Sequence, residues 1–513
     1  MTAPVPDVTV VVAVYNTMPY LTGCLESILT QTIGTDRLQV IAVDDGSTDG
    51  GGAELDAWAA RFPRTLTVLR QPNSGGPAGP SNRALERATG RYVFFVGADD
   101  RLGPQALERL VAAADETGAD IVLGRLVGAG GRRVDQSVFA GGDRDAITLA
   151  GSPLAWALSN TKLFRRALIE EHRIRFPEDM ASCSDQPFTI RAVLAARRIA
   201  VRTGYDFYYA IRRTDASNIT FRTPVTRLLH DTALLLARAA DLVTEPRARH
   251  NLLVRHFSWE VGKLLGERFL AAGPADREAV HRGVGALAGA YLTEEARRAL
   301  PVRHRAAISL AQHGTVADVL AVARHYAEHR LRPAVAEAGR YYVAFPGFRA
   351  AGRDFPDEWF DATAEVLAID RQDGPAVVGW GRGPDGRPAL LLRWPTWIPR
   401  QAGEPAPVVK VRRGPSVPAE LSRATAGAVI PVDDLVRGES HGRFRDITFR
   451  RGTLKYPVTA ADVSAAGRRL HRVGGRFFLV AVVRGPDDRV GVEVRPITVR
   501  RVAARLRRTL RRG

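Results

Sequence analysis

The sequence has few cysteines and no long apolar run. Only two of its 513 residues are cysteines, Cys24 and Cys183, which is too few for a disulfide framework or a cysteine-based metal site. No stretch approaches the roughly 20 consecutive apolar residues that a membrane-spanning helix needs, and the first residues lack the basic and apolar regions of a signal peptide. We therefore expect a protein of a reducing compartment, located in the cytoplasm.

Acidic residues are outnumbered by basic ones. The formal net charge of +18 favours an anionic partner, which by charge alone is a nucleic acid, an acidic membrane face or a polyanionic substrate. General sequence bias also explains part of this excess, because the chain is rich in Ala, Gly, Arg and Pro. No RNA-binding aromatic motif is present, so nucleic acid is not the partner that we expect.

Short apolar runs alternate with helical patterns over the first 125 residues. Predicted buried strands cover 8–14, 39–43, 65–69, 93–97 and 120–123. An apolar stripe at helical spacing within 21–29 predicts a helix between the first two strands. Strand, helix and strand at this spacing form a βαβ unit, so we predict a parallel, doubly wound, Rossmann-like sheet.

The rest of the chain changes character twice. Up to residue 220 the pattern predicts a helix over 161–172, a loop over 176–185, a helix over 187–196 and a strand over 205–211. Helical periodicity dominates 222–335, and short runs of period two follow residue 355. These predicted strands, typical of a β-sandwich or small barrel, cover 364–369, 376–380, 390–394, 408–411, 444–449, 477–483 and 490–494.

Four segments follow from these changes. We predict a catalytic α/β domain over 1–221, an α-helical linker subdomain over 222–350, a β-rich domain over 351–498 and a basic tail over 499–513. The tail residues Arg500 to Gly513 include seven arginines and no acid, with apolar residues spaced by four. This pattern fits either an amphipathic helix on an anionic membrane surface or a disordered charged tail.

Two adjacent carboxylates, Asp99 and Asp100, directly follow the apolar strand predicted at 93–97. Ligands of α/β folds collect outside the carboxyl ends of such strands. Two carboxylates on a short segment suit Mg²⁺ or Mn²⁺, which share their remaining positions with phosphate and water. The structural alternative is that Asp99 caps the helix that follows.

The order of several motifs resembles the inverting family-two glycosyltransferases of the GT-A fold. The motifs are Val-Val-Val-Ala-Val-Tyr-Asn at 10–16, Val-Asp-Asp-Gly-Ser-Thr-Asp at 43–49, the glycine loop from Asn73, Gly-Ala-Asp-Asp at 97–100 and Ser-Asp-Gln-Pro-Phe at 184–188. The match covers roughly residues 8 to 220. With its helical linker and β-rich C-terminal part, the chain most resembles the wall teichoic acid (polyribitol-phosphate) N-acetylglucosaminyltransferases.

The resemblance implies a site for the uracil of a UDP-sugar. Ala13 and Tyr15 would flank the base, with the ring of Tyr15 as a stacking face. Asp45 would accept a hydrogen bond from the imide nitrogen of the base, with Asp44 as its fallback, and Asn73 would complete the site. A turn contact made by Asp44 or Asp45 is the structural alternative.

The resemblance also implies a diphosphate site. Asp99 and Asp100 would meet the metal ion that bridges the donor diphosphate. The remaining nucleotide-sugar residues would be Ala98 and a closing loop with Arg212, Arg213 and Ser217. Arginine suits this role because its planar fork pairs with phosphate oxygens, although a solvated surface pair is the alternative.

Asp185 is the candidate general base. Inverting transfer is one in-line displacement, so a carboxylate must take the proton of the acceptor hydroxyl on the face opposite the leaving group. The alternative is an N-cap for a helix that begins at Pro187.

Two residues depart from the family pattern. Gly97 stands where the family has a first acid, and Ser81 stands where it has an arginine, for which Arg83 is a possible substitute.

The leading hypothesis is a metal-dependent inverting transferase that moves N-acetylglucosamine from UDP-N-acetylglucosamine to a hydroxyl of an anionic cell-envelope polymer. The resemblance suggests a homotrimer, with the β-rich domain as an oligomerisation or polymer-binding module. One rival is a transferase for capsular or other surface polysaccharide with a different donor. A rival of another class is a non-catalytic polyanion-binding protein on a transferase scaffold.

Overall fold

A computed structural model of the protein describes most of the chain. The described residues are 5–213, 223–331, 334–337, 340–372, 376–395, 406–421, 425–437, 444–451, 454–460, 463, 466–485 and 489–497. They belong to two compact units, one of Met1–Leu300 with His304–Arg324 and one of Pro301–Arg303 with His325–Gly513. Ser217 and the basic tail, both singled out above, lie outside the described residues.

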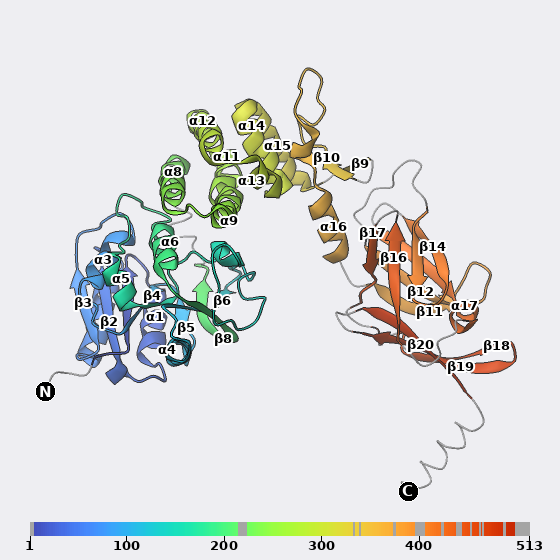
Figure 1. Cartoon of the computed structure of the whole chain (residues 1–513), viewed down its shortest axis with the longest axis horizontal. Coiled ribbons are helices and arrows are strands. Elements are labelled where there is room, and N and C mark those ends of the chain that lie inside the picture. Colours follow the sequence, from blue (N-terminus) through green and yellow to red (C-terminus); the bar gives the residue numbers. More distant parts are fainter. Residues whose placement is uncertain are drawn as a thin grey trace, which may run out of the picture. The chain divides into compact units, whose positions relative to one another are not determined.

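An eight-stranded sheet forms the centre of the first unit (Figure 1), in the order β3-β2-β1-β4-β7-β6-β8-β5. The strands are β1 (Val8–Val14), β2 (Leu38–Asp44), β3 (Leu66–Arg70), β4 (Tyr92–Gly97), β5 (Arg101–Leu102), β6 (Ile121–Ala129), β7 (Leu163–Arg165) and β8 (Ile199–Ile211). Strand β1 pairs in parallel with β2 and β4, and β2 pairs in parallel with β3. The carboxyl ends of four neighbouring strands therefore lie at one edge, as the sequence predicts.

Helices cover both faces of this sheet. One core contains side chains of α1 (Tyr20–Leu29), α2 (Gly51–Arg61) and α4 (Ala106–Thr117). The other contains side chains of α3 (Ala78–Leu85), α5 (Arg166–Glu171) and α6 (Asp185–Ala195). Because neighbouring strand residues point to opposite faces, Val10 belongs to the first core and Val11 to the second. The prediction of a Rossmann-like α/β domain is confirmed.

The helix predicted over 161–172 is only partly present. Residues Leu163–Arg165 form β7, and α5 begins at Arg166. Phe164 is fully buried and is paired antiparallel with Val93 on one side and Ile121 on the other. Pairing with the strands on both sides thus makes this segment a strand despite its helical pattern. Local propensity does not reveal such a tertiary effect.

A helical region follows, in agreement with its sequence periodicity. Its elements are α8 (Val225–Leu242), α9 (Pro246–His256), a π-helical turn η3 (Phe257–Val261), α10 (Gly262–Leu264), α11 (Glu267–Ala271), α12 (Pro274–Tyr291), α13 (Glu294–Ala299), α14 (Val302–His313) and α15 (Val316–His329). Val243 and Leu252 join the second core of the sheet, so the first linker helices pack on the α/β domain. Among the described residues, the helices are too short or too polar to cross a membrane.

The second unit contains the expected antiparallel β domain (Figure 1). Its sheet contains β11 (Val377–Arg382), β12 (Pro388–Pro395), β13 (Val408–Val411), β14 (Ser416–Leu421), β15 (Thr425–Pro431), β16 (Arg445–Arg451), β17 (Leu454–Pro457), β18 (Arg468–Val473), β19 (Arg476–Arg484) and β20 (Val490–Pro496). A short helix α17 (Val432–Arg437) follows β15. Strands from both ends of the sheet share one core, for example Val378 of β11 and Val480 of β19.

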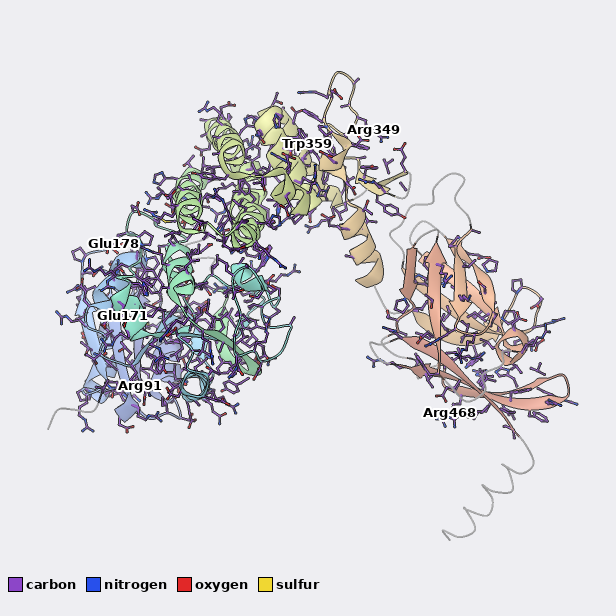
Figure 2. The ribbon with its side chains drawn as sticks, in the orientation of Figure 1. Arg91, Glu171, Glu178, Arg349, Trp359 and Arg468 are labelled. Carbon is purple, nitrogen blue, oxygen red and sulfur yellow. The ribbon has the colours of Figure 1, made fainter. Side chains whose placement is uncertain are left out.

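A small connecting region precedes this sheet. It contains β9 (Ala334–Glu337), β10 (Arg340–Val343), the turn η4 (Asp357–Phe360) and α16 (Thr363–Gln372). Arg349, labelled in Figure 2 with Trp359, joins this region by ion pairs to Glu337 and Asp357. Arg468, labelled in the same figure, marks β18 at one end of the large sheet.

The strand predicted over 364–369 is wrong, because these residues lie in α16. The Asp361 carboxylate accepts a hydrogen bond from the backbone N–H of Thr363, which favours helix initiation. By periodicity alone, a short apolar run fits a strand and a buried helix equally well. Here the polar turn before the run favours the helix.

Candidate active site

The candidate site lies at the carboxyl ends of the parallel strands. Tyr15 and Asn16 follow β1, Asp44 ends β2, and Asp99 follows β4. Asn16 has a φ of 48°, a backbone conformation that is uncommon outside glycine and that clusters at functional sites. This edge is the usual ligand-binding edge of an open α/β sheet.

Asp99 is bound by an arginine from the far end of the sheet. The Nε of Arg213, just after β8, donates to Oδ2 of Asp99 at 2.7 Å, and its Nη1 donates to the carbonyl of Asn16 at 3.3 Å. The ion pair is largely buried. Helix α4 begins at Ala106, so Asp99 does not cap it. Arg213 thus connects the ends of β8, β4 and β1 around one carboxylate.

Asp100 points into the protein instead. Its Oδ2 accepts from the hydroxyl of Tyr208 at 2.6 Å, its Oδ1 accepts from the backbone N–H of Ile211 at 2.7 Å, and the guanidinium of Arg132 lies 3.5 Å away. Burial and the neighbouring Asp99 raise the pKa of Asp100 to about 6. Tyr208 and Arg132 were not among the residues predicted from the sequence, because neither belongs to a local motif.

The residues present fit a metal ion that is shared with a ligand. Among the described residues, no group of three or more His, Cys, Asp or Glu side chains is arranged to hold a metal ion alone. Mg²⁺ and Mn²⁺ are commonly held by one or two carboxylates plus substrate phosphates. An ion at Asp100 would have to compete with two short hydrogen bonds within the protein, and an ion at Asp99 with the ion pair to Arg213, so Asp99 suits this role better.

Gly97 is explained by its surroundings. A Cβ atom at this position would lie 2.9 Å from Oδ2 of Asp100 and 3.3 Å from the hydroxyl of Tyr208. The backbone N–H of Gly97 also donates to that hydroxyl at 3.0 Å. The space that a family carboxylate would need is thus occupied by Asp100 and its tyrosine.

The predicted base-binding residues organise two loops. Asp45 accepts from the side chain of Gln71 at 2.7 Å and from the hydroxyl of Ser74 at 2.9 Å. Asp44 accepts from the backbone N–H of Ser47 at 2.9 Å, so the turn alternative describes Asp44. Asn73 accepts from the N–H of Gly75 at 2.7 Å. These contacts place the glycine loop beside the end of β2.

The other predicted donor residues are spread along the same edge. Ala13 lies in β1, Ala98 is buried, and Tyr15 is 44% exposed, which leaves its ring accessible for stacking. The exposed Arg212 has no side-chain contact with Asp99 or Asp100 in the described part of the chain, unlike its neighbour. Arg83 donates to the carbonyl of Arg70 and to the side chain of Gln71, and so contacts the base side of the site. Ser81 is buried in α3.

Asp185 begins helix α6 and is partly exposed. The helix starts at Asp185 itself, so the alternative of a cap for a helix starting at Pro187 does not hold. Desolvation raises the pKa of Asp185 to about 6, the buried ammonium of Lys162 lowers it, and the carboxylate of Glu260 raises it. A carboxyl group that titrates near neutral pH is suited to accept and release a proton.

Glu260 reaches this site from the linker helices. It lies in the π-helical turn η3 and is 7% exposed. Its carboxylate accepts from the side chain of Gln186 at 2.9 Å and pairs with Arg255. π-Helical turns are rare and often mark functional sites. No sequence signal pointed to Glu260 or to Lys162, because both act across elements that are distant in the chain.

Four phenylalanines join the strand of Asp99 to the helix of Asp185. The ring of Phe95 in β4 contacts those of Phe164, Phe176 and Phe188 edge to face, at centroid distances of 6.1, 5.1 and 5.4 Å. The rings of Phe176 and Phe188 stack with their centroids 4.1 Å apart.

The glycine loop lies close to the loop before α6. A Cβ atom at Gly76 would lie 3.1 Å from the carbonyl oxygen of Ala181.

The chain matches two family models. Residues 9–146 match the model "Glycosyl transferase family 2", and residues 233–323 match the "Glycosyl transferase TarS linker domain". The first match lies within the N-terminal α/β domain, which is therefore similar to family 2 glycosyltransferases. The linker match begins within α8 and ends within α15, and it includes the turn η3, which supplies Glu260 to the neighbourhood of Asp185.

Curated relatives share the N-terminal part. The poly(ribitol-phosphate) beta-glucosyltransferase of Bacillus spizizenii is 36% identical over 206 residues, which is 40% of this chain and 32% of that protein. The poly(ribitol-phosphate) beta-N-acetylglucosaminyltransferase TarS of Staphylococcus aureus is 37% identical over 204 residues, which is 40% of this chain and 35% of that protein. The chain spans about a third of the length of these relatives.

Solved structures extend the likeness. The crystal structure of S. aureus TarS matches with a TM-score of 0.69 at 21% identity, covering 96% of this chain and 86% of that one, which shows a shared fold. The structure of TarS 1-349 in complex with UDP-GlcNAc matches with a TM-score of 0.56 at 27% identity, covering 68% of this chain and 98% of that one.

Proposed function

We propose that the protein is a metal-dependent, inverting glycosyltransferase that moves a sugar from a UDP-sugar to a hydroxyl of a poly(ribitol phosphate) chain. The observation that carries this proposal is that the first unit contains two carboxylates suited to different roles, those of Asp99 and Asp185. Asp99 is held by Arg213 at the ligand-binding edge, and Asp185 begins the helix packed against the same strand through Phe95. The family 2 and TarS linker matches support it.

The donor would bind along the carboxyl ends of β1, β2 and β4. Tyr15 provides an exposed ring for the uracil, and Asp45 with Asn73 orders the loop beside it. Asp99 would hold Mg²⁺ or Mn²⁺, whose positive charge offsets the charge on the diphosphate leaving group. Arg213 is poised to exchange its contact with Asp99 for one with a phosphate oxygen, since guanidinium groups pair well with both.

Asp185 would act on the acceptor. Its carboxylate takes the proton of the attacking hydroxyl while the oxygen attacks the anomeric carbon from the face opposite the diphosphate. One displacement inverts the anomeric configuration. Burial raises the pKa of this carboxyl group to about 6, while the charge of Lys162 lowers it and that of Glu260 raises it.

The named relatives differ in the sugar that they transfer. One named relative is a glucosyltransferase and another an N-acetylglucosaminyltransferase. We propose that N-acetylglucosamine is the transferred sugar.

The net charge of +18 fits a polyanionic acceptor, because a cationic surface attracts a polyanion over a long range.

Turnover with defined donors and acceptors tests the proposal. UDP-N-acetylglucosamine and UDP-glucose would each be offered with poly(ribitol phosphate) or with a neutral surface polysaccharide, with and without Mn²⁺. We expect Mn²⁺-stimulated release of UDP and a sugar on the polyol phosphate. Preference for the neutral polysaccharide supports the capsular alternative, and binding of the polyanion without UDP release supports the non-catalytic one.

Two assignments beyond the site also belong to this proposal. The β domain would mediate assembly into a trimer or bind polymer, and the tail Arg500–Gly513 would associate with anionic lipid at the cytoplasmic membrane face. Sedimentation of the full chain tests the first. Comparing vesicle binding by the full chain and by a chain ending at residue 499 tests the second, with turnover on a soluble acceptor as the control.

A further inference from the structure

A cavity of about 460 Å³ lies between the α/β domain and the linker helices of the first unit. One wall is a single face of α9, where Arg247, His250, Asn251 and Val254 follow at helical spacing. The opposite wall is the segment 150–156, tied to this face by a 2.9 Å hydrogen bond from Asn251 to the carbonyl of Leu149. Its volume is typical of small-ligand sites, which span roughly 300–1,000 Å³.

The polar groups of this cavity suit an anion that also carries hydroxyls. The guanidinium of Arg247 is exposed and makes no hydrogen bond or ion pair within the described residues. The Nδ1 of His250 is buried without a hydrogen-bond partner there, and the nearest carboxylate, that of the exposed Glu295, is 3.9 Å away. The one carboxylate of the lining, Asp135, already accepts from the backbone N–H of Ser137 at 2.9 Å.

Direct contacts connect the cavity to the neighbourhood of the candidate base. Trp156 lines the cavity. The guanidinium of Arg255 lies over the ring of Trp156, 5.5 Å from the ring centroid. Arg255 pairs with Glu260, and Glu260 accepts from Gln186, the residue after Asp185. These direct side-chain contacts join the cavity to the neighbourhood of Asp185 within the first unit.

We propose that the cavity is a remote acceptor subsite, in which Arg247 and His250 bind a phosphodiester of a polyol-phosphate chain and the polar walls contact its hydroxyls. This proposal rests on the proposed function. A subsite away from the reacting hydroxyl binds only acceptors that are long enough to reach it. The enzyme would accordingly favour long acceptors over short ones.

The test compares Arg247→Gln and His250→Gln with a matched control, Arg249→Gln. Arg249 is an exposed arginine of the same helix that does not line the cavity. The acceptors are dimeric ribitol phosphate and long poly(ribitol phosphate), with UDP-N-acetylglucosamine as donor. We expect each cavity variant to raise the KM for the polymer about tenfold, as the loss of one charge-assisted hydrogen bond implies. Turnover of the dimer should be unchanged, and the control should match the wild type.

A second variant blocks the cavity without removing charge. Ser152 lines the wall opposite α9, and Ser152→Tyr would fill the space. It should lose the preference for polymer to the same extent as Arg247→Gln. An unchanged KM for polymer in all three cavity variants, or an equal loss on dimer and polymer, overturns the subsite.

Direct binding separates this proposal from the proposed function. Calorimetric titration of the full chain with poly(ribitol phosphate) requires no turnover. If the wild type transfers no sugar but binds the polymer, and Arg247→Gln weakens that binding while Arg249→Gln does not, the subsite stands and the catalytic proposal fails. If wild type and Arg247→Gln bind equally, the subsite fails whatever the turnover.

Discussion

The rings of Phe95 and Phe188 meet edge to face with their centroids 5.4 Å apart. Phe95 belongs to β4, which leads to Asp99, and Phe188 belongs to α6, which begins at Asp185. Both phenylalanine side chains are almost completely buried. Since close-packed aromatic contacts resist displacement, this pair fixes the strand of the proposed metal ligand relative to the helix of the proposed base.

Removal of the Phe188 ring should therefore weaken both fold and function. We expect Phe188→Ala to lower the free energy of unfolding by about 3–5 kcal/mol, and Phe188→Leu by less, because a smaller cavity remains. Urea unfolding measures the loss, and turnover below the transition measures the effect on geometry. Phe477→Ala, at a ring 47% exposed in the β domain, serves as control and should leave both unchanged. Full stability of Phe188→Ala would contradict the inferred packing.

Asp185→Asn should abolish transfer while donor binding persists. Asparagine keeps the size of the side chain but cannot take a proton, and general-base catalysis contributes roughly 10²- to 10⁴-fold. Steady-state kinetics and titration with UDP-sugar would measure the two effects separately. Asp179→Asn is the matched control, since Asp179 lies in the preceding loop and pairs with Arg238. A variant that keeps most of its turnover would refute the base assignment.

The pH dependence of kcat/KM should reflect the pKa of Asp185. Because that pKa is raised to about 6, the carboxylate is ionised and able to accept a proton above this pH and is neutral below it. Activity should rise with pH through about 6 and then level off. An acid limb near the ordinary value of an aspartate would show that the burial effect is absent.

Two substitutions should move this acid limb in opposite directions. Glu260→Gln removes a negative charge that raises the pKa of Asp185, so the limb should move to lower pH. Lys162→Met removes a positive charge that lowers the same pKa, so the limb should move to higher pH. Shifts in the same direction would point to structural damage in place of electrostatics.

The sequence predicted the parts of the fold that depend on local pattern. Apolar period and βαβ spacing were enough for β1, which the structure places at Val8–Val14 as predicted. The strand at Leu163–Arg165 was not recognised, since its pairing partners lie far away in the chain. The helix α16 cannot be told from a strand by its sequence, because the same apolar run fits both periods.

The candidate site divides in a similar way. Asp99 and Asp185 belong to contiguous motifs and could be singled out from the sequence. Tyr208, Lys162 and Glu260 could not, because their roles arise from contacts with residues that are distant in sequence, such as the hydrogen bond of Tyr208 to Asp100. What sequence reasoning missed is mainly the charge environment, which only the folded chain creates.

Gly97→Asp should reduce activity although it restores the acid that the family pattern has. The new side chain would begin 2.9 Å from Oδ2 of Asp100, where close contact and like charge both disfavour it. Gly97→Ala, which adds the contact without the charge, separates the two effects. The Mn²⁺ dependence of UDP release is the measurement. A variant with aspartate that needs less Mn²⁺ for the same rate would show that the site can accept a further ligand.

Arg213→Ala should weaken donor binding, and Arg212→Ala should not. Arg213 contacts Asp99 at 2.7 Å, whereas Arg212 is exposed and contacts neither acid in the described part of the chain. Loss of one charge-assisted contact to phosphate, about 1.5–3 kcal/mol, predicts a rise of roughly 10- to 150-fold in the KM for UDP-sugar. Arg213→Lys should recover only part of it, because an ammonium lacks the planar fork that pairs with two oxygens. An unchanged KM for UDP-sugar in Arg213→Ala would refute the role of Arg213 at the diphosphate and leave its largely buried ion pair with Asp99 as a structural contact.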